Sequence, residues 1–241
     1  MIMKPHYSHF GEDVLLDFVF KDQDNGFYVD VGAYHPVLFS NTKLLYDRGW
    51  KGINIDPNIK SIEIFKEIRP RDINLNIAVS DQEGELDYYK FLEIDEAGGG
   101  SGNSLSEEVK NKYESQGLTA QVSRVEVKQL TTIFDKYLHN KTIDLLNVDV
   151  EGFDLRVLKS NDWNRYKPRI IAIEIWINEI DFDNLFGNSI YQYLLSLGYK
   201  AFSCLLDTWF FYDTAYPLFQ RKETNNQKIL ESFISKMRPK K

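Results

Sequence analysis

The sequence predicts an α/β fold, a three-layer sandwich in which helices cover both faces of one mostly parallel β-sheet. Three observations support this expectation. Short apolar runs of strand length alternate with stretches of helical periodicity, a pattern typical of parallel sheets. The length of 241 residues fits a single large α/β domain, here residues 1–241. Apolar residues make up 43% of the chain, enough for a sizeable core.

Apolar runs of strand length recur along the whole chain. Five of them alternate with helical patterns and are expected to lie parallel in the sheet, and two more near the end of the chain could form a closing antiparallel pair. The expected strands cover residues 27–31, 51–55, 73–79, 143–150, 170–176, 199–204 and 208–212.

Capping residues, glycine and proline mark the helix boundaries. Ser40 or Asn41 can cap a helix that continues to about Arg48. Pro57 suits the first turn of the next helix, and Gly198 can end the last one. These two helices are expected at 58–68 and 184–197, and two more at 12–21 and 130–138.

Residues 84–128 interrupt this alternation and predict an inserted flap. The strands expected at 84–91 and 121–128 lack the continuous apolar character of the others. Four glycines fall within residues 98–102, where regular structure would cost much conformational entropy. We therefore expect a mobile loop there, followed by a polar helix near 105–116.

The charge of the chain is acidic overall but basic at its end. The formal net charge is −7, which argues against a general nucleic-acid-binding protein. Residues 220–241 carry seven basic and two acidic residues, a net charge of +5, which leaves −12 for the rest. This basic tail could touch an anionic surface, but a solvated end is the favoured interpretation.

The single cysteine, Cys204, stands in an apolar run, which favours a buried packing role and excludes a disulfide within the chain. No apolar stretch has the length of a signal peptide or approaches that of a transmembrane helix. A cytoplasmic location without a membrane span is the expectation.

Polar residues end the strands at the edge where open α/β sheets bind ligands. Four of these five strand-ending residues are acidic, which structural loops do not require. The five strand-ending residues are Asp30, Asp56, Ser80, Asp149 and Glu174.

The turn after the first strand predicts a Rossmann-like nucleotide site. Asp30 ends the strand, Gly32 and Ala33 form the turn, and Asp56 follows at the end of the second strand, where an acid can accept both ribose hydroxyls. A dinucleotide needs further glycines beside its pyrophosphate. None occurs between Gly32 and Gly49, which favours S-adenosylmethionine over NAD.

A second acidic group follows the fourth main strand. Asp149, Glu151 and Asp154 lie within six residues, which is costly unless the carboxylates are solvated, paired or metal-bound. Asp149 and Glu151 are catalytic candidates, whereas Asp154 could cap the next helix. If a metal binds, Asp149 and Glu151 with Glu174 would suit Mg²⁺ or Mn²⁺, although the metal-free interpretation is favoured.

Three further features carry both a functional and a structural interpretation. His35, just past the glycine turn, could be a general base or an ordinary loop histidine. Asn41 could contact the amino-acid end of the methyl donor or cap a helix. Aromatic pairs such as Tyr88 and Tyr89 could line a sugar site, but aromatic strand residues usually belong to the core.

Five segments in sequence order carry a family resemblance: FYVDVGA at 27–33, SNT at 40–42, GWKGINIDP at 49–57, AVSD at 78–81 and DLLNVDVEG at 144–152. Together they resemble the FkbM family of class I S-adenosylmethionine-dependent methyltransferases. The resemblance implies a seven-stranded Rossmann-like fold and O-methylation of a hydroxyl, commonly on a sugar or a natural product. The turn at 34–36 is similar to a His-Pro subgroup of the family.

The resemblance also implies roles for single residues. Asp30 and Gly32 would lie under the methionine part of the donor, and Asp56 would hold its ribose. The adenine would be bordered by Val79 and Ser80. The acceptor, a small molecule or a nucleotide-linked sugar, would face Asp149 and Glu151.

The favoured hypothesis is direct displacement at the methyl group, with His35 or Asp149 removing the proton of a sugar hydroxyl. A nicotinamide-dependent oxidoreductase or epimerase of nucleotide sugars is the first alternative, against which the missing glycines count. A non-catalytic binding protein on a methyltransferase scaffold is the second, against which the intact Asp30, Gly32 and Asp56 count.

Overall fold

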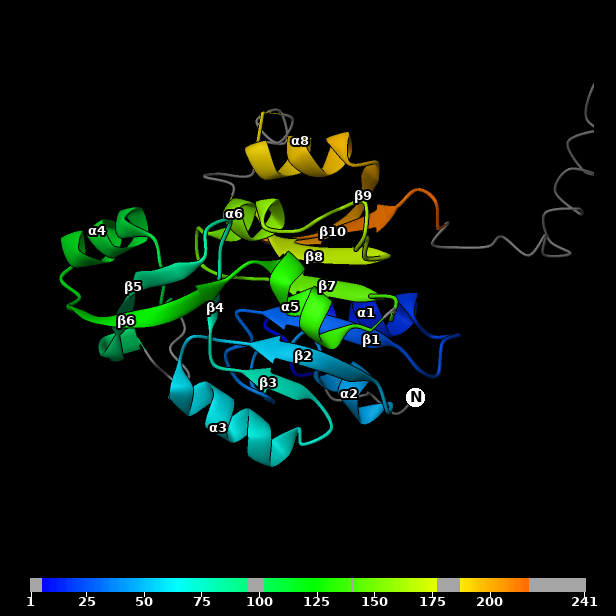
Figure 1. The fold of residues 1–241 in the computed structure, drawn as a ribbon, viewed down its shortest axis with the longest axis horizontal. Coiled ribbons are helices and arrows are strands. Elements are labelled where there is room, and N and C mark those ends of the chain that lie inside the picture. The colour runs from blue at the N-terminus through cyan, green and yellow to red at the C-terminus, as the bar shows by residue number, and fades with distance from the viewer. Residues whose placement is uncertain (1–5, 95–101, 140, 177–186, 217–241) are drawn as a thin grey trace, which may run out of the picture.

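The computed structural model describes residues 6–94, 102–139, 141–176 and 187–216. Within these residues the central sheet has seven strands in the order β3-β2-β1-β7-β8-β10-β9 (Figure 1). Only β10 runs against its neighbours, so the expectation of a mostly parallel α/β sheet is confirmed. The strands are β1 Phe27–Val31, β2 Lys51–Ile55, β3 Ile73–Leu75, β7 Leu145–Val148, β8 Ile170–Glu174, β9 Tyr199–Leu205 and β10 Thr208–Asp213.

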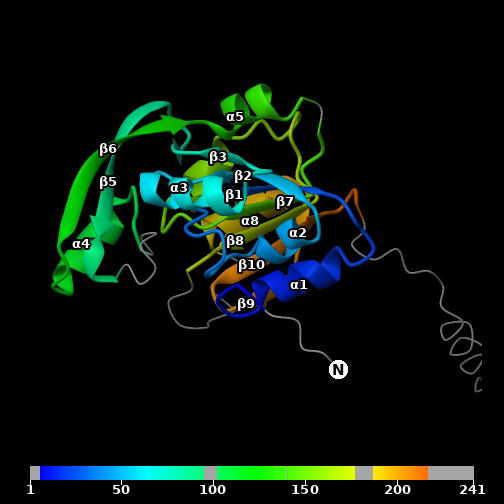
Figure 2. The same ribbon diagram turned by 90° about the horizontal axis from the view of Figure 1, so that it is seen from below.

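Helices cover both faces of this sheet because its central strands are apolar on both sides. Every residue of β1 is buried: Val29 packs with α5, α6 and α8 on one face, and Tyr28 packs with α1 and α2 on the other. Figure 2 shows α1 and α2 on one side and α5 on the other. The helices are α1 Glu12–Val19, α2 Lys43–Asp47, α3 Ile59–Ile68, α5 Leu130–Tyr137, α6 Asp154–Lys159 and α8 Ser189–Ser196.

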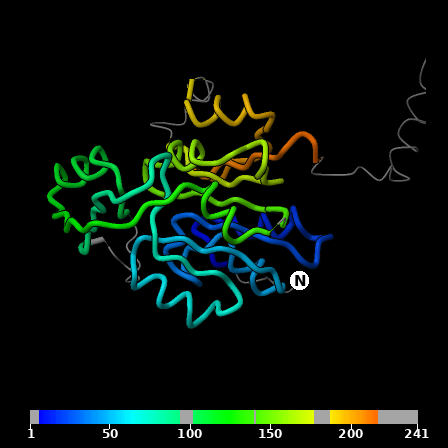
Figure 3. The backbone as a smooth tube through the Cα atoms, viewed as in Figure 1, coloured from blue at the N-terminus to red at the C-terminus, as the bar shows by residue number. Residues whose placement is uncertain are grey.

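A second, three-stranded sheet stands beside the central one. Its order is β4-β6-β5, with β4 Ala78–Val79, β5 Gly84–Phe91 and β6 Ala120–Lys128. The short helix η1 Leu92–Ile94 and the helix α4 Glu107–Ser115 belong to the connection between β5 and β6. The backbone trace enters this unit after β3 and returns to the central sheet through α5 and β7 (Figure 3).

The expected strand at 73–79 was wrong, because its two ends belong to different sheets. β3 pairs with β2, whereas Ala78 and Val79 pair with β6. Between them the side chain of Asn76 donates hydrogen bonds to the carbonyls of Asp56 and Pro57 at 3.1 and 2.9 Å. These bonds hold the chain where it leaves the central sheet.

Several expectations fall outside the described residues: the basic tail at 220–241, the glycines at 98–100 and the start of the helix expected at 184. Among the residues that the structure does describe, no helix is both long and apolar enough to cross a membrane.

Candidate active site

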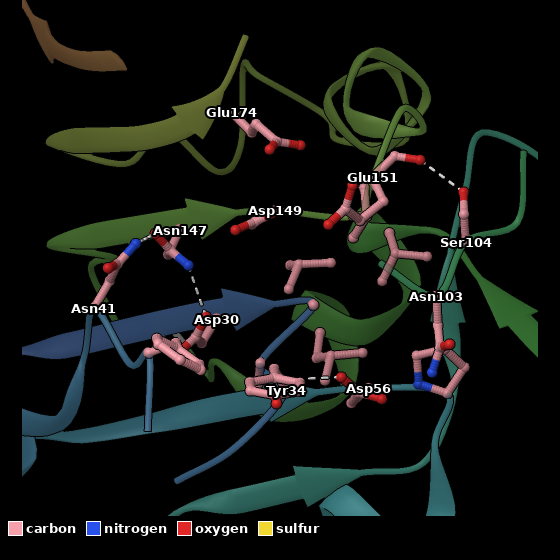
Figure 4. Close-up of a pocket in the computed structure, with 18 of the residues that line it drawn as sticks. Asp30, Tyr34, Asn41, Asp56, Asn103, Ser104, Asn147, Asp149, Glu151 and Glu174 are labelled. Atoms are coloured by element: carbon pink, nitrogen blue, oxygen red, sulfur yellow. Dashed lines mark hydrogen bonds between the residues drawn. The ribbon is translucent and has the colours of Figure 1, made fainter. Parts of the chain in front are cut away.

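A cavity of about 560 Å³ lies at the carboxyl ends of β1, β2 and β7 (Figure 4). Its other walls come from the end of β8, from residues 102–105 of the second sheet's connection, and from His9, Phe10 and Glu12 near α1. Ligands of open α/β sheets bind at this edge. All four acids expected at strand ends line the cavity, namely Asp30, Asp56, Asp149 and Glu174.

Asp30 is held on both carboxylate oxygens. The hydroxyl of Thr42 donates to one at 2.6 Å, and the amide of Asn147 donates to the other at 2.8 Å. Burial raises the pKa of Asp30, while the Thr42 hydrogen bond and the nearby Arg69 charge oppose that rise. The carboxylate is therefore fixed in direction at the floor of the cavity.

Arg69 anchors this arrangement, and the sequence interpretation missed it. Its fully buried guanidinium donates to Thr42 at 2.8 Å, to the Ser40 hydroxyl at 2.7 Å and to the Pro36 carbonyl at 3.0 Å. Thr42 thus links Arg69 to Asp30. A signal existed, because position 69 continues the helical spacing of the buried Ile62 and Phe65.

Asn41 does not cap α2, which begins after Thr42. Instead its side-chain amide donates to the side-chain oxygen of Asn147 at 3.0 Å, and both residues line the cavity. Asn147 is a second residue that sequence reasoning missed, since it stands inside a buried strand where an amide is rarely left without partners.

The turn at Gly32 requires glycine for a reason of packing. Its φ is +78°, and a Cβ there would stand 1.7 Å from the carbonyl oxygen of Asp149. The amides of Gly32 and Ala33 both donate to the carbonyl of Ile55, at 3.0 and 3.1 Å. The turns after β1 and β7 therefore touch backbone to backbone, and Gly32 and Ala33 line the cavity beside them.

Asp56 accepts backbone hydrogen bonds from Tyr34 at 2.9 Å and from Asn58 at 2.7 Å, one on each oxygen. Burial raises its pKa to about 7, against the effect of these two bonds. Each carboxylate oxygen can accept more than one hydrogen bond. Asp56 can thus receive two donors from a bound ligand, such as neighbouring hydroxyls.

His35 stands in the turn after β1 but is not among the residues lining the cavity. Its Nδ1 accepts hydrogen bonds from the amides of Val37 and Leu38 at 3.1 and 3.0 Å. Burial, and then the Arg69 charge, lowers its pKa. The structure thus gives Nδ1 a role in shaping the turn and does not bring His35 to the acidic group.

The two residues expected beside the adenine are separated. Val79 lines the cavity with Ile77 and Ala78, on the side of Asp56. Ser80 is fully buried outside the cavity lining, and its hydroxyl donates to Asp81 at 3.0 Å. The backbone explains this placement, because the Ser80 amide continues the pairing with β6 through Lys128.

Three carboxylates converge at the opposite end of the cavity. One oxygen each of Asp149, Glu151 and Glu174 lies within 4.8 Å of the others. Asp149 keeps contact with solvent in the cavity, yet enclosure by protein and the charge of Glu151 raise its pKa well above the usual range. Enclosure, and then the Asp149 charge, raises the pKa of Glu174 to about 11. The mutual repulsion of these carboxylates therefore disfavours full ionisation of the acidic group.

The turn that presents the acidic group is held from both sides. Asp154 accepts hydrogen bonds from the amides of Val150 and Gly152 at 3.2 and 3.1 Å, so its carboxylate closes the turn ahead of α6. From the second sheet, the hydroxyl of Ser104 donates to the carbonyl of Glu151 at 2.6 Å. This contact joins the inserted unit to the candidate catalytic residues.

The chain matches a family model described as the methyltransferase FkbM domain over residues 30–201. The match covers most of the chain and includes Asp30, Asp56, Asp149 and Glu174, the four acids at the strand ends. Comparisons with curated proteins and with solved structures found no match.

Proposed function

Because the chain belongs to the FkbM methyltransferase family, we propose that it transfers a methyl group from S-adenosylmethionine to a hydroxyl group of a sugar. One observation carries the proposal: a single cavity has the hydrogen-bonded carboxylates of Asp30 and Asp56 in one half and a group of three close carboxylates in the other. A nucleotide-linked sugar or a precursor of a polysaccharide fits this chemistry, since its hydroxyls need a base.

The residues of the first half fit the methyl donor. Asp56 would accept the ribose hydroxyls, and Val79 with Ile77 would border the adenine. Asp30 and Asn41 would hold the amino-acid end, with Gly32 and Ala33 beneath it. When bound, S-adenosylmethionine supplies a methyl group on a sulfonium that needs no further activation.

Asp149 is the proposed general base. A sugar hydroxyl is a weak nucleophile at neutral pH, and a base is most effective when its pKa lies near the working pH. The raised pKa of Asp149 moves it in that direction. The nearby charge of Glu151 would favour uptake of that proton by Asp149, and Ser104 would keep Glu151 in place through its backbone.

Titration calorimetry with S-adenosylhomocysteine and with NAD tests the proposed function. Binding of the former alone is expected. Binding of NAD would favour the oxidoreductase or epimerase, and binding of neither would favour a non-catalytic protein. A screen of nucleotide-linked sugars with labelled S-adenosylmethionine would then identify the acceptor.

The affinity for S-adenosylhomocysteine is expected to depend on pH through Asp56. Its pKa of about 7 means that the ligand-binding ionised form is depleted below neutrality. Affinity should therefore rise roughly tenfold from about pH 6 to about pH 8. The variant Asp56→Asn should bind roughly tenfold more weakly at the higher pH and lose most of the pH dependence. A flat calorimetric profile in the unmodified protein would exclude this role.

Removal of divalent cations distinguishes the two ways of activating the hydroxyl. If Asp149 acts directly as the base, treatment with a chelator should leave the rate of methyl transfer within about twofold of the untreated value. Asp149, Glu151 and Glu174 could instead hold Mg²⁺ or Mn²⁺, which lowers the pKa of a bound hydroxyl. A rate that falls on chelation and returns with either ion would establish that metal-dependent route.

A further inference from the structure

We propose that the acceptor carries an apolar chain, which lies in a groove along α1 that opens from the candidate active site. The inference rests on the proposed function, because it assigns a substrate class to the same site. The groove has a volume of about 690 Å³ and lies between α1 and β9. Its apolar lining includes Phe10, Val14, Leu15, Phe18 and Leu205.

The groove and the cavity are continuous, since His9 and Phe10 line both. The ring of His9 lies 4.4 Å from that of Phe10 and 4.7 Å from that of Phe39, another cavity residue. The side chains of His9, Phe10 and Phe39 therefore form an aromatic junction between the cavity and the groove.

Surrounding hydrogen bonds fix the position of this junction. The buried carboxylate of Glu12 accepts the amide hydrogen of Phe10 at 2.7 Å. The fully buried Asp13 accepts from the amide of Tyr7 at 2.7 Å and from the hydroxyl of Ser8 at 2.6 Å. The exposed ring of Phe10 is thus attached to a well-braced turn.

The groove opens beside the acceptor half of the cavity. Thr208 lines the cavity and pairs with Glu174, a member of the acidic group. The groove residue Leu205 precedes Thr208 in the same hairpin. Asp56, at the nucleoside half, follows β2, which lies on the other side of β1 in the strand order, and Val79 belongs to β4 of the second sheet. A chain in the groove would therefore belong to the acceptor.

The outer surface of α1 is suited to apolar contact. Val14 and Phe18 stand four residues apart on α1, and Phe10 precedes the helix; the three are 45%, 53% and 52% exposed. The core packs against other residues of α1, chiefly the fully buried Leu16. An apolar strip of this kind marks an interaction site, and its continuity with the cavity favours an alkyl or isoprenoid chain whose hydroxylated head faces Asp149.

Binding of two glucosides that differ only in the chain tests the inference. Methyl and n-octyl β-D-glucoside, the latter below its micelle concentration, are titrated calorimetrically into the 241-residue chain saturated with S-adenosylhomocysteine. Each buried methylene is worth roughly a fourfold gain in affinity. The octyl compound is expected to bind at least about tenfold more tightly.

Charged substitutions on α1 test whether the gain in affinity from the octyl chain arises in the groove. Val14→Asp and Phe18→Asp should each abolish most of the difference between the two glucosides. Leu195→Asp is the matched control, an exposed leucine on α8 at the opposite face of the sheet, and should keep the difference. Equal affinities in the unmodified protein, or a difference that survives both α1 variants, would overturn the inference.

Two further measurements separate the remaining outcomes. Failure to bind S-adenosylhomocysteine in the first place would refute the proposed function, whereas its binding without any effect of chain length would refute only the apolar subsite. Light scattering gives the mass of each variant in solution. An α1 variant that halves the mass of an oligomer without a chain-length effect would instead assign the groove to contacts between copies.

Discussion

Replacing Asp149 by asparagine is expected to lower kcat for methyl transfer by about a thousandfold. The amide has nearly the same shape as the carboxylate but cannot accept a proton from the acceptor hydroxyl. Affinity for S-adenosylhomocysteine should be unchanged, because the proposed donor contacts come from other residues. The melting temperature should not fall, since the substitution removes a charge from a crowded acidic group.

Initial rates with labelled S-adenosylmethionine measure this effect, and calorimetry checks donor binding in the same preparation. Asp135→Asn is the control, a carboxylate in a surface ion pair with Arg165, and should leave the rate unchanged. Full activity of Asp149→Asn would eliminate both the general-base and the metal-dependent routes.

The second large effect is expected on folding, from Gly32→Ala. The added Cβ would stand 1.7 Å from the Asp149 carbonyl oxygen, well inside contact distance, and the φ of +78° is unfavourable for alanine. Neither group can move away cheaply, because both belong to the backbone of adjacent turns. We expect a loss of at least about 4 kcal/mol in the free energy of unfolding, or a protein that fails to accumulate.

Gly49→Ala provides a matched control for that experiment. Gly49 also has a left-handed backbone, with φ of +98°, but nothing lies within 4 Å of the position its Cβ would take. Its loss should be about 1 kcal/mol, the cost of the backbone conformation alone. Denaturant unfolding of the two variants measures the difference, and equal losses would mean that the turns separate without strain.

Local patterns in the sequence were sufficient for the parallel sheet and for the acids at its edge. Asp30, Asp56, Asp149 and Glu174 could be placed together because parallel strands end at one edge, whatever their separation along the chain. The close contact behind Gly32 could not be anticipated in the same way. Glycine signals a special turn, but only the structure identifies the Asp149 backbone as the obstacle.

Features that depend on distant pairing escaped sequence reasoning. The run at 73–79 is uniformly suited to a strand, and nothing local shows that Ala78 and Val79 pair with β6, about fifty residues away in sequence. Ser80 was expected at the cavity because it follows this run, but its pairing with Lys128 places it outside the cavity lining. The buried position of Arg69 was concealed by its charge, since arginine is rarely placed in a core without specific partners.

The strands of the second sheet are hydrogen-bonded separately from the central sheet, which affects how the cavity wall can be altered by engineering or in evolution. Its strands β4, β5 and β6 pair with one another and with no strand of the central sheet among the described residues. This unit nevertheless contributes Tyr88, Asn103 and Ser104 to the cavity wall. Changes at these three positions are therefore expected to reshape the wall of the cavity while the Arg69–Thr42–Asp30 network stays intact.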